Sequence, residues 1–97
     1  MKPQELKQAL AEGEHIRLID VREKDEFAAA DKKLEGAENI TMGQMFLDAA
    51  KGTLPKEEKI VVTCMKGGRC EVVARELRNR GYNIEHLEGG IEAYYMS

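Results

Sequence analysis

Six consecutive residues combine a nucleophile, two glycines and two cations, and they read Cys64-Met65-Lys66-Gly67-Gly68-Arg69. A free cysteine thiol has a pKa of about 8.5, but beside Lys or Arg at a helix N-terminus this pKa falls to roughly 3.5–7.5. Glycines let the backbone turn inward, so that successive amides point at one anion. The pattern predicts that Cys64 is a thiolate, that Lys66 and Arg69 supply positive charge, and that the amides of Met65 to Arg69 form a cradle. A cysteine that only fills the core is the alternative, and it would need neither glycines nor cations beside it.

The elements on either side of this loop must position the cysteine. Ile60, Val61 and Val62 form a short β-branched run, which is typical of a strand buried on both faces. Residues 71–80 place Val72, Val73 and Leu77 on one stripe, which predicts an amphipathic helix. Cys64 is therefore expected just past the end of a strand and just before a helix N-terminus, where the helix dipole favours an anion.

The rest of the chain alternates helical and extended segments. We expect a helix over residues 3–12 ended by Gly13, a strand over 16–21, a strand over 38–40, a helix over 44–50 capped by Thr41, and a last strand over 83–87. Gly81 is expected to end the helix that follows the cysteine loop. This alternation predicts an α/β fold with a central, mainly parallel sheet and helices on both faces. Ninety-seven residues suit a single domain, 1–97.

Asp20 and Arg22 follow the first predicted strand. In an open parallel sheet the carboxyl ends of strands share one edge, so Asp20 is expected at the same edge as Cys64. Asp20 is expected to cap the next helix and support the neighbouring loop, because thiol sulfur transfer needs no buried carboxylate. Arg22 and Glu26 have the i, i+4 spacing of a surface ion pair. Phe27 is expected in the core.

Composition excludes several classes of function. The formal net charge is −3, and no basic surface is assembled for a phosphate backbone, so no nucleic-acid partner is expected. No apolar run approaches the ~20 residues of a membrane span, and no secretory signal is present, which predicts a soluble cytoplasmic protein with no membrane partner. His15 and His86 lack companions, and the two cysteines match no zinc spacing. We therefore expect no metal and no cofactor.

The loop from Cys64 to Arg69 resembles the active-site loop of the rhodanese family, with the pattern Cys-x-x-Gly-x-Arg. Two further stretches are similar to that family: residues 20–27, with an Asp-Val-Arg triplet before a short helix, and residues 87–94, with Leu-Glu-Gly-Gly. The chain departs from the family at two places. Residues 30–37 are longer than the family's usual Gly-His-Ile segment and lack its histidine, and Tyr94 stands where a tryptophan is usual. The resemblance implies a rhodanese-like three-layer α/β/α fold with about four to five strands.

The same resemblance implies a thiosulfate sulfurtransferase that works through a persulfide on Cys64. Lys66 and Arg69 would bind the sulfonate of a small anionic donor, and the loop amides would stabilise the outer sulfur. The acceptor would be cyanide in an assay, or a thiol or thioredoxin-like protein in a cell. Gly89 and Gly90 permit a tight turn at a strand end, and they are expected to form part of the pocket wall.

Two other classes of function stay open. The first is a persulfide carrier or sulfur-sensing binding module without useful turnover, and the second is an arsenate reductase or phosphatase on the same scaffold. The six-residue loop disfavours the second class, because the related enzymes that hold a tetrahedral oxyanion have one more residue between cysteine and arginine. Cys70 either packs in the first turn of the helix or attacks the Cys64 persulfide to form a disulfide, which requires Cα atoms within about 7 Å.

Overall fold

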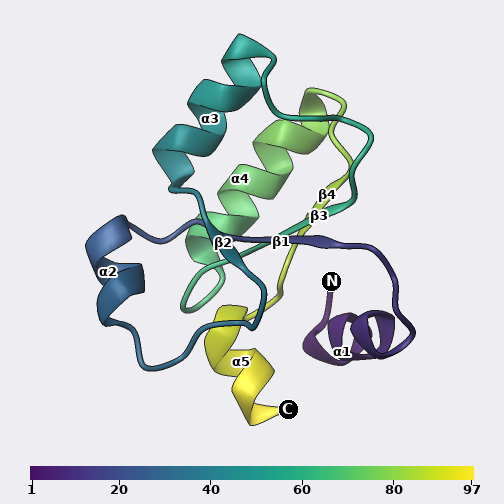
Figure 1. The fold of residues 1–97 in the computed structure, drawn as a ribbon, viewed down its shortest axis with the longest axis vertical. Helices are drawn as coiled ribbons and strands as arrows, with labels where there is room; N and C mark the ends of the chain where they lie inside the picture. Colours follow the sequence, from purple (N-terminus) through teal and green to yellow (C-terminus); the bar gives the residue numbers. More distant parts are fainter.

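The computed structural model describes all 97 residues of the chain. Five helices and four strands alternate along the sequence, as Figure 1 shows. In order they are α1 (Pro3–Ala11), β1 (Arg17–Asp20), α2 (Lys24–Ala29), β2 (Glu38–Asn39), α3 (Met42–Lys51), β3 (Ile60–Thr63), α4 (Gly68–Asn79), β4 (Ile84–His86) and α5 (Gly90–Met96).

The four strands form one parallel sheet with the order β2-β1-β3-β4. Asp20 at the end of β1 is in register with Thr63 at the end of β3, and Cys64 follows directly. The expected α/β architecture with a parallel central sheet is confirmed, and the sheet has four strands. Parallel pairing brings the carboxyl ends of β1 and β3 to one edge of the sheet, which is why Asp20 and Cys64 lie near each other.

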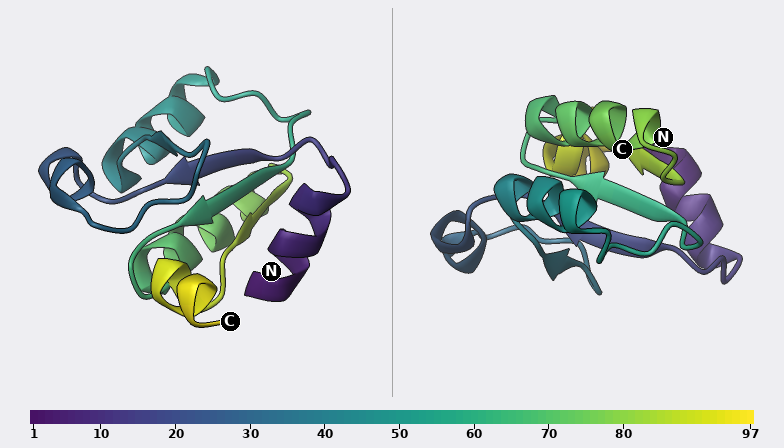
Figure 2. Two further views of the ribbon diagram at one scale, coloured as in Figure 1. Left: turned by 60° about the horizontal axis from the view of Figure 1, so that its bottom comes forward. Right: turned by 90° about the horizontal axis from the view of Figure 1, so that it is seen from above.

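Helices cover both faces of the sheet. One core cluster joins the sheet to α3 and α4, and a second joins it to α1 and α5. In Figure 1 the first pair lies above the sheet and the second pair below it, and Figure 2 shows the layers from two further sides. Along β3, Ile60 and Val62 belong to the first cluster and Val61 to the second. Both faces of this strand are buried, so its sequence is continuously apolar.

The predicted helix caps at α1 and α3 are correct. The Thr41 hydroxyl accepts a hydrogen bond from the Gln44 amide at 3.3 Å, and Gly13 follows α1 with a positive φ of 77°. The position predicted for Phe27 is wrong. Helix α2 buries none of its residues, and the half-buried Phe27 ring is contacted by the Arg22 guanidinium and the Lys33 ammonium.

Helix α5 was not predicted from the sequence, and α4 begins at Gly68, three residues before the predicted start. Each helix starts directly after a glycine with positive φ, Gly89 and Gly67 respectively. Glycine has a low intrinsic helix propensity, so local pattern disfavours helix at both starts. Tertiary packing of Cys70 and Ile91 into the core overrides that preference. None of the five helices is both long and apolar enough to span a membrane.

Candidate active site

Cys64 lies at the base of a pocket at the carboxyl edge of the sheet. The pocket has a volume of about 420 Å³, and its lining consists of Glu26, Cys64, Met65, Lys66, Gly68 and Arg69. Only 1% of the Cys64 residue is exposed. Its Sγ accepts hydrogen bonds from the Gly67 amide at 3.2 Å and the Cys70 amide at 3.4 Å. The side chain therefore faces the amide cradle at the N-terminus of α4.

Hydrogen bonding lowers the pKa of the Cys64 thiol to about 5, against the opposing effect of burial. The Cys70 thiol is the largest contributor, followed by the backbone amides of Cys70, Gly67 and Arg69. The sequence predicted the contribution of the loop amides, together with positive charge from Lys66 and Arg69, but it did not predict the contribution of the Cys70 side chain. The cations do not dominate because backbone amides donate directly to the sulfur, whereas the Arg69 guanidinium donates to the Glu26 carboxylate.

The lowered pKa of Cys64 predicts how its rate of alkylation depends on pH. The alkylation rate of Cys64 by iodoacetamide should be constant at neutral pH and fall as the pH drops through about 5, because protonation removes the nucleophilic thiolate. Cys70→Ala should move the midpoint upward, because it removes the largest contributor to the lowered pKa. Stopped alkylation samples analysed by mass spectrometry would give both profiles. A midpoint above pH 8 in the unmodified protein would contradict the cradle as described.

Arg69 is paired across the pocket with Glu26. Its two terminal nitrogens donate to the two carboxylate oxygens, Nη1 to Oε1 at 2.7 Å and Nη2 to Oε2 at 2.8 Å. The predicted surface pair between Arg22 and Glu26 is therefore wrong, since Glu26 binds a residue 43 positions away. The Arg69 side chain lowers the pKa of the Glu26 carboxyl to about 2, mainly through these hydrogen bonds. No sequence spacing signals this partner, because only the fold brings α2 beside the cysteine loop.

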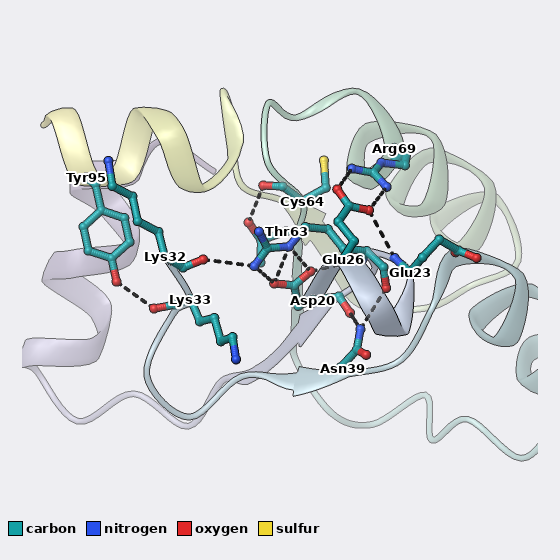
Figure 3. A network of polar contacts seen from close by, with 11 residues as sticks. Asp20, Glu23, Glu26, Lys32, Lys33, Asn39, Thr63, Cys64, Arg69 and Tyr95 are labelled. Carbon is teal, nitrogen blue, oxygen red and sulfur yellow. Dashed lines mark hydrogen bonds and ion pairs between the residues drawn. The ribbon is translucent and has the colours of Figure 1, made fainter. Parts of the chain in front are cut away.

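Asp20 and Arg22 form a completely buried ion pair beneath the site, as Figure 3 shows for Asp20. The Asp20 carboxylate accepts from the Arg22 amide at 3.0 Å and from the guanidinium Nη2 at 2.7 Å. The predicted capping role of Asp20 is wrong, because Glu23 is the N-cap residue of α2. The guanidinium also donates to the Lys32 carbonyl at 3.1 Å, so it anchors the segment that departs from the rhodanese pattern. The supporting role is structural, and neither side chain lines the pocket.

Gly89 and Gly90 lie behind the cysteine loop and do not line the pocket, so the prediction of a pocket wall is wrong. A Cβ built on Gly90 would lie 2.5 Å from the Cys64 carbonyl oxygen, and one on Gly67 would lie 3.1 Å from the Gly89 nitrogen. The first amides of α5 donate to the loop carbonyls, Ile91 N to Cys64 O at 2.9 Å and Glu92 N to Met65 O at 3.0 Å.

These bonds orient the peptide groups of the loop. In a trans peptide the C=O and N–H point in opposite directions, so tying the carbonyls of Cys64 and Met65 to α5 turns the amides of Met65 and Lys66 away from α5. Neither of these two amides makes a hydrogen bond within the protein. They are unpaired donors in the cysteine loop.

Gly90→Ala is expected to lower the free energy of unfolding by about 2–3 kcal/mol, because the methyl group meets loop backbone and the residue has a positive φ of 66°. Gly13→Ala is the matched control, since Gly13 has a φ of 77° with no atom near its Cβ position. Urea unfolding of both variants would separate collision from backbone strain. Equal losses in the two would show that Gly90 does not brace the loop.

Cys70 is completely buried, and its Sγ lies 3.3 Å from the Gly67 carbonyl oxygen. The Cys64 thiolate and burial both raise the pKa of the Cys70 thiol far above its usual range. Cys70 therefore holds its proton at neutral pH, and its thiol donates to the Gly67 carbonyl while its backbone amide donates to the Cys64 Sγ. The two thiols are free.

Known proteins resemble this chain in both sequence and structure. A family model described as a rhodanese-like domain matches residues 2–97. The chain is 33% identical over 89 residues to the Bacillus subtilis (strain 168) protein named putative sulfurtransferase YtwF, a match that covers 92% of this chain and 82% of that protein. It is 30% identical over 89 residues to the tRNA uridine(34) hydroxylase of Sodalis glossinidius, covering 89% of this chain but 25% of that protein. The structure of human single-domain sulfurtransferase TSTD1 superposes with a TM-score of 0.80 at 24% identity, over 100% of this chain and 95% of that chain.

Proposed function

The chain belongs to the rhodanese-like family of sulfurtransferases, and on that premise we propose that it transfers sulfane sulfur through a persulfide on Cys64. The donor is thiosulfate or another small sulfane-sulfur compound, and the acceptor is cyanide in an assay or a thiol, free or on a thioredoxin-like protein, in a cell. One observation carries the proposal: the Cys64 Sγ faces two backbone amides in the pocket, and its pKa is lowered to about 5.

The first half-reaction loads the cysteine. The Cys64 thiolate attacks the outer sulfur of thiosulfate, a new S–S bond forms, and the bond between the outer sulfur and the sulfonate breaks. Its electron pair leaves with sulfite, so the reaction exchanges no protons. Splitting the transfer into two displacements is covalent catalysis.

The loop then stabilises the loaded state. The available amides of Met65 and Lys66 would hold the anionic outer sulfur, in the manner of an oxyanion hole. The exposed Lys66 ammonium, which makes no ion pair, would attract the sulfonate of the donor. Arg69 would contribute only the N–H groups that Glu26 does not occupy.

The second half-reaction unloads the cysteine. An acceptor nucleophile attacks the outer sulfur, the S–S bond to Cys64 breaks, and the electron pair returns to the Cys64 thiolate. Cyanide leaves as thiocyanate, and a thiolate leaves as a new persulfide. Hydrolysis of phosphate or reduction of arsenate is not supported, because the loop from Cys64 to Arg69 is one residue shorter than the loops that hold a tetrahedral oxyanion.

A mass measurement tests the proposal. Thiosulfate without any other thiol should add the mass of one sulfur atom to the protein, and peptide mapping should locate it on Cys64. Cyanide, small thiols and a thioredoxin-like protein are then added separately to see which remove the sulfur. Loading without removal by any of them would indicate a carrier. Absence of loading with every donor, together with hydrolysis of an aryl phosphate, would overturn the assignment.

A further inference from the structure

The Glu26–Arg69 pair occupies the wall of the pocket above the nucleophile. Figure 3 shows the guanidinium and carboxylate beside the Cys64 sulfur, with both Glu26 oxygens used. Both side chains are only partly exposed, 38% for Arg69 and 39% for Glu26. The pair is therefore a fixed part of the pocket surface that an entering donor meets.

The carboxylate is fixed from a second side. Glu26 is the third residue of α2, and its Oε1 accepts from the Glu23 amide at 3.3 Å as half of a capping box. The Arg22 guanidinium adds a favourable charge behind it. Because helix and arginine both hold Glu26, it does not swing away when a ligand approaches.

The pair changes the charge that the pocket presents. Of the lining residues, Glu26 cancels Arg69, and the Lys66 cation is balanced by the Cys64 thiolate. A free arginine would have made this pocket positive and suited to a dianion. A pocket whose charges sum to zero, with a carboxylate on its wall, penalises each additional negative charge on a ligand.

We propose that Glu26 is the specificity-determining residue of this pocket: by neutralising Arg69 it disfavours dianionic donors such as thiosulfate and favours donors that bear one negative charge, a class that includes alkyl persulfides. The proposal rests on the proposed function for its chemistry. A persulfide donor reacts in the same way as thiosulfate. The Cys64 thiolate attacks the donor's outer sulfur, the donor's S–S bond breaks, and its electron pair leaves with the alkyl thiolate.

Two donors that differ in charge test the substrate class. Thiosulfate is a dianion, and methanethiosulfonate presents the same outer sulfur on a monoanion. Glu26→Gln keeps the size and removes the charge, so kcat/KM should rise about tenfold for thiosulfate and about threefold for methanethiosulfonate, since the repulsion scales with ligand charge. Glu38→Gln is the matched control, because Glu38 pairs with Arg17 on the surface away from the pocket. It should change neither value.

A second measurement does not depend on sulfur transfer. Iodoacetate is an anion and iodoacetamide is neutral, and both alkylate a thiolate. Glu26→Gln should raise the ratio of their rates with Cys64 about threefold. If that ratio rises but wild-type protein takes sulfur from no donor, the proposed function fails while the charge selectivity stands. An unchanged ratio, or equal gains with the two sulfur donors, overturns the role of Glu26 even if Cys64 is loaded normally.

Discussion

Replacing Cys64 with serine is expected to abolish sulfur loading and thiocyanate formation completely. A serine hydroxyl stays protonated in the same cradle and cannot form a persulfide, whereas the thiol of Cys64 is ionised above pH of about 5. The fold should survive, since a hydroxyl still accepts from the Gly67 amide that now donates at 3.2 Å. Intact mass after incubation with thiosulfate, together with a thiocyanate assay, measures the effect.

Cys70→Ser is the matched control for that variant. It changes the other buried thiol of the site but leaves the nucleophile, so sulfur should still load on Cys64. Loading that persists in Cys64→Ser, or sulfur mapped to Cys70, would contradict the assignment of the nucleophile. A Cys64–Cys70 disulfide found after thiosulfate treatment would instead identify Cys70 as a resolving thiol, against the raised pKa of its side chain.

Asp20→Asn is expected to cost about 3–5 kcal/mol of the free energy of unfolding, because it leaves the Arg22 charge buried without a counterion. No other carboxylate pairs with the guanidinium, and its Nη1 makes no hydrogen bond within the protein even before the substitution. Urea unfolding followed by circular dichroism measures the loss. This is a stability effect on the base of the site and needs no change in the pocket lining.

Two further variants isolate the cause. Glu38→Gln breaks the exposed pair with Arg17 and should cost less than ~1 kcal/mol, as surface ion pairs do. Replacing both buried partners, Asp20→Leu with Arg22→Met, should recover much of the loss because no uncompensated charge remains. If Asp20→Asn cost no more than Glu38→Gln, the buried pair would not support the fold as described.

The sequence alone determined the α/β architecture and the place of Cys64 between a strand and the amide cradle of a helix N-terminus. The apolar run before Cys64, the glycines after it and the amphipathic helix that follows are local patterns, and local patterns predict strands, helices and the end of a strand where a reactive group lies. The order of strands and helices was enough for a parallel α/β sheet. The cap at Thr41 was read correctly for the same reason, because its partner is three residues away.

Only the tertiary structure decided how the site is charged and supported. Glu26 and Arg69 are 43 residues apart in the sequence and form an ion pair in the fold, and Gly90, near the end of the chain, packs against the Cys64 carbonyl. Arg22 and Glu26 have the i, i+4 spacing of a helical ion pair, but each has a different partner in the fold. Arg22 pairs with Asp20, and Glu26 pairs with Arg69. The arginine that the sequence offered to a donor is therefore held by a carboxylate, because hydrogen bonds and ion pairs depend on distances in space that spacing along the chain does not contain.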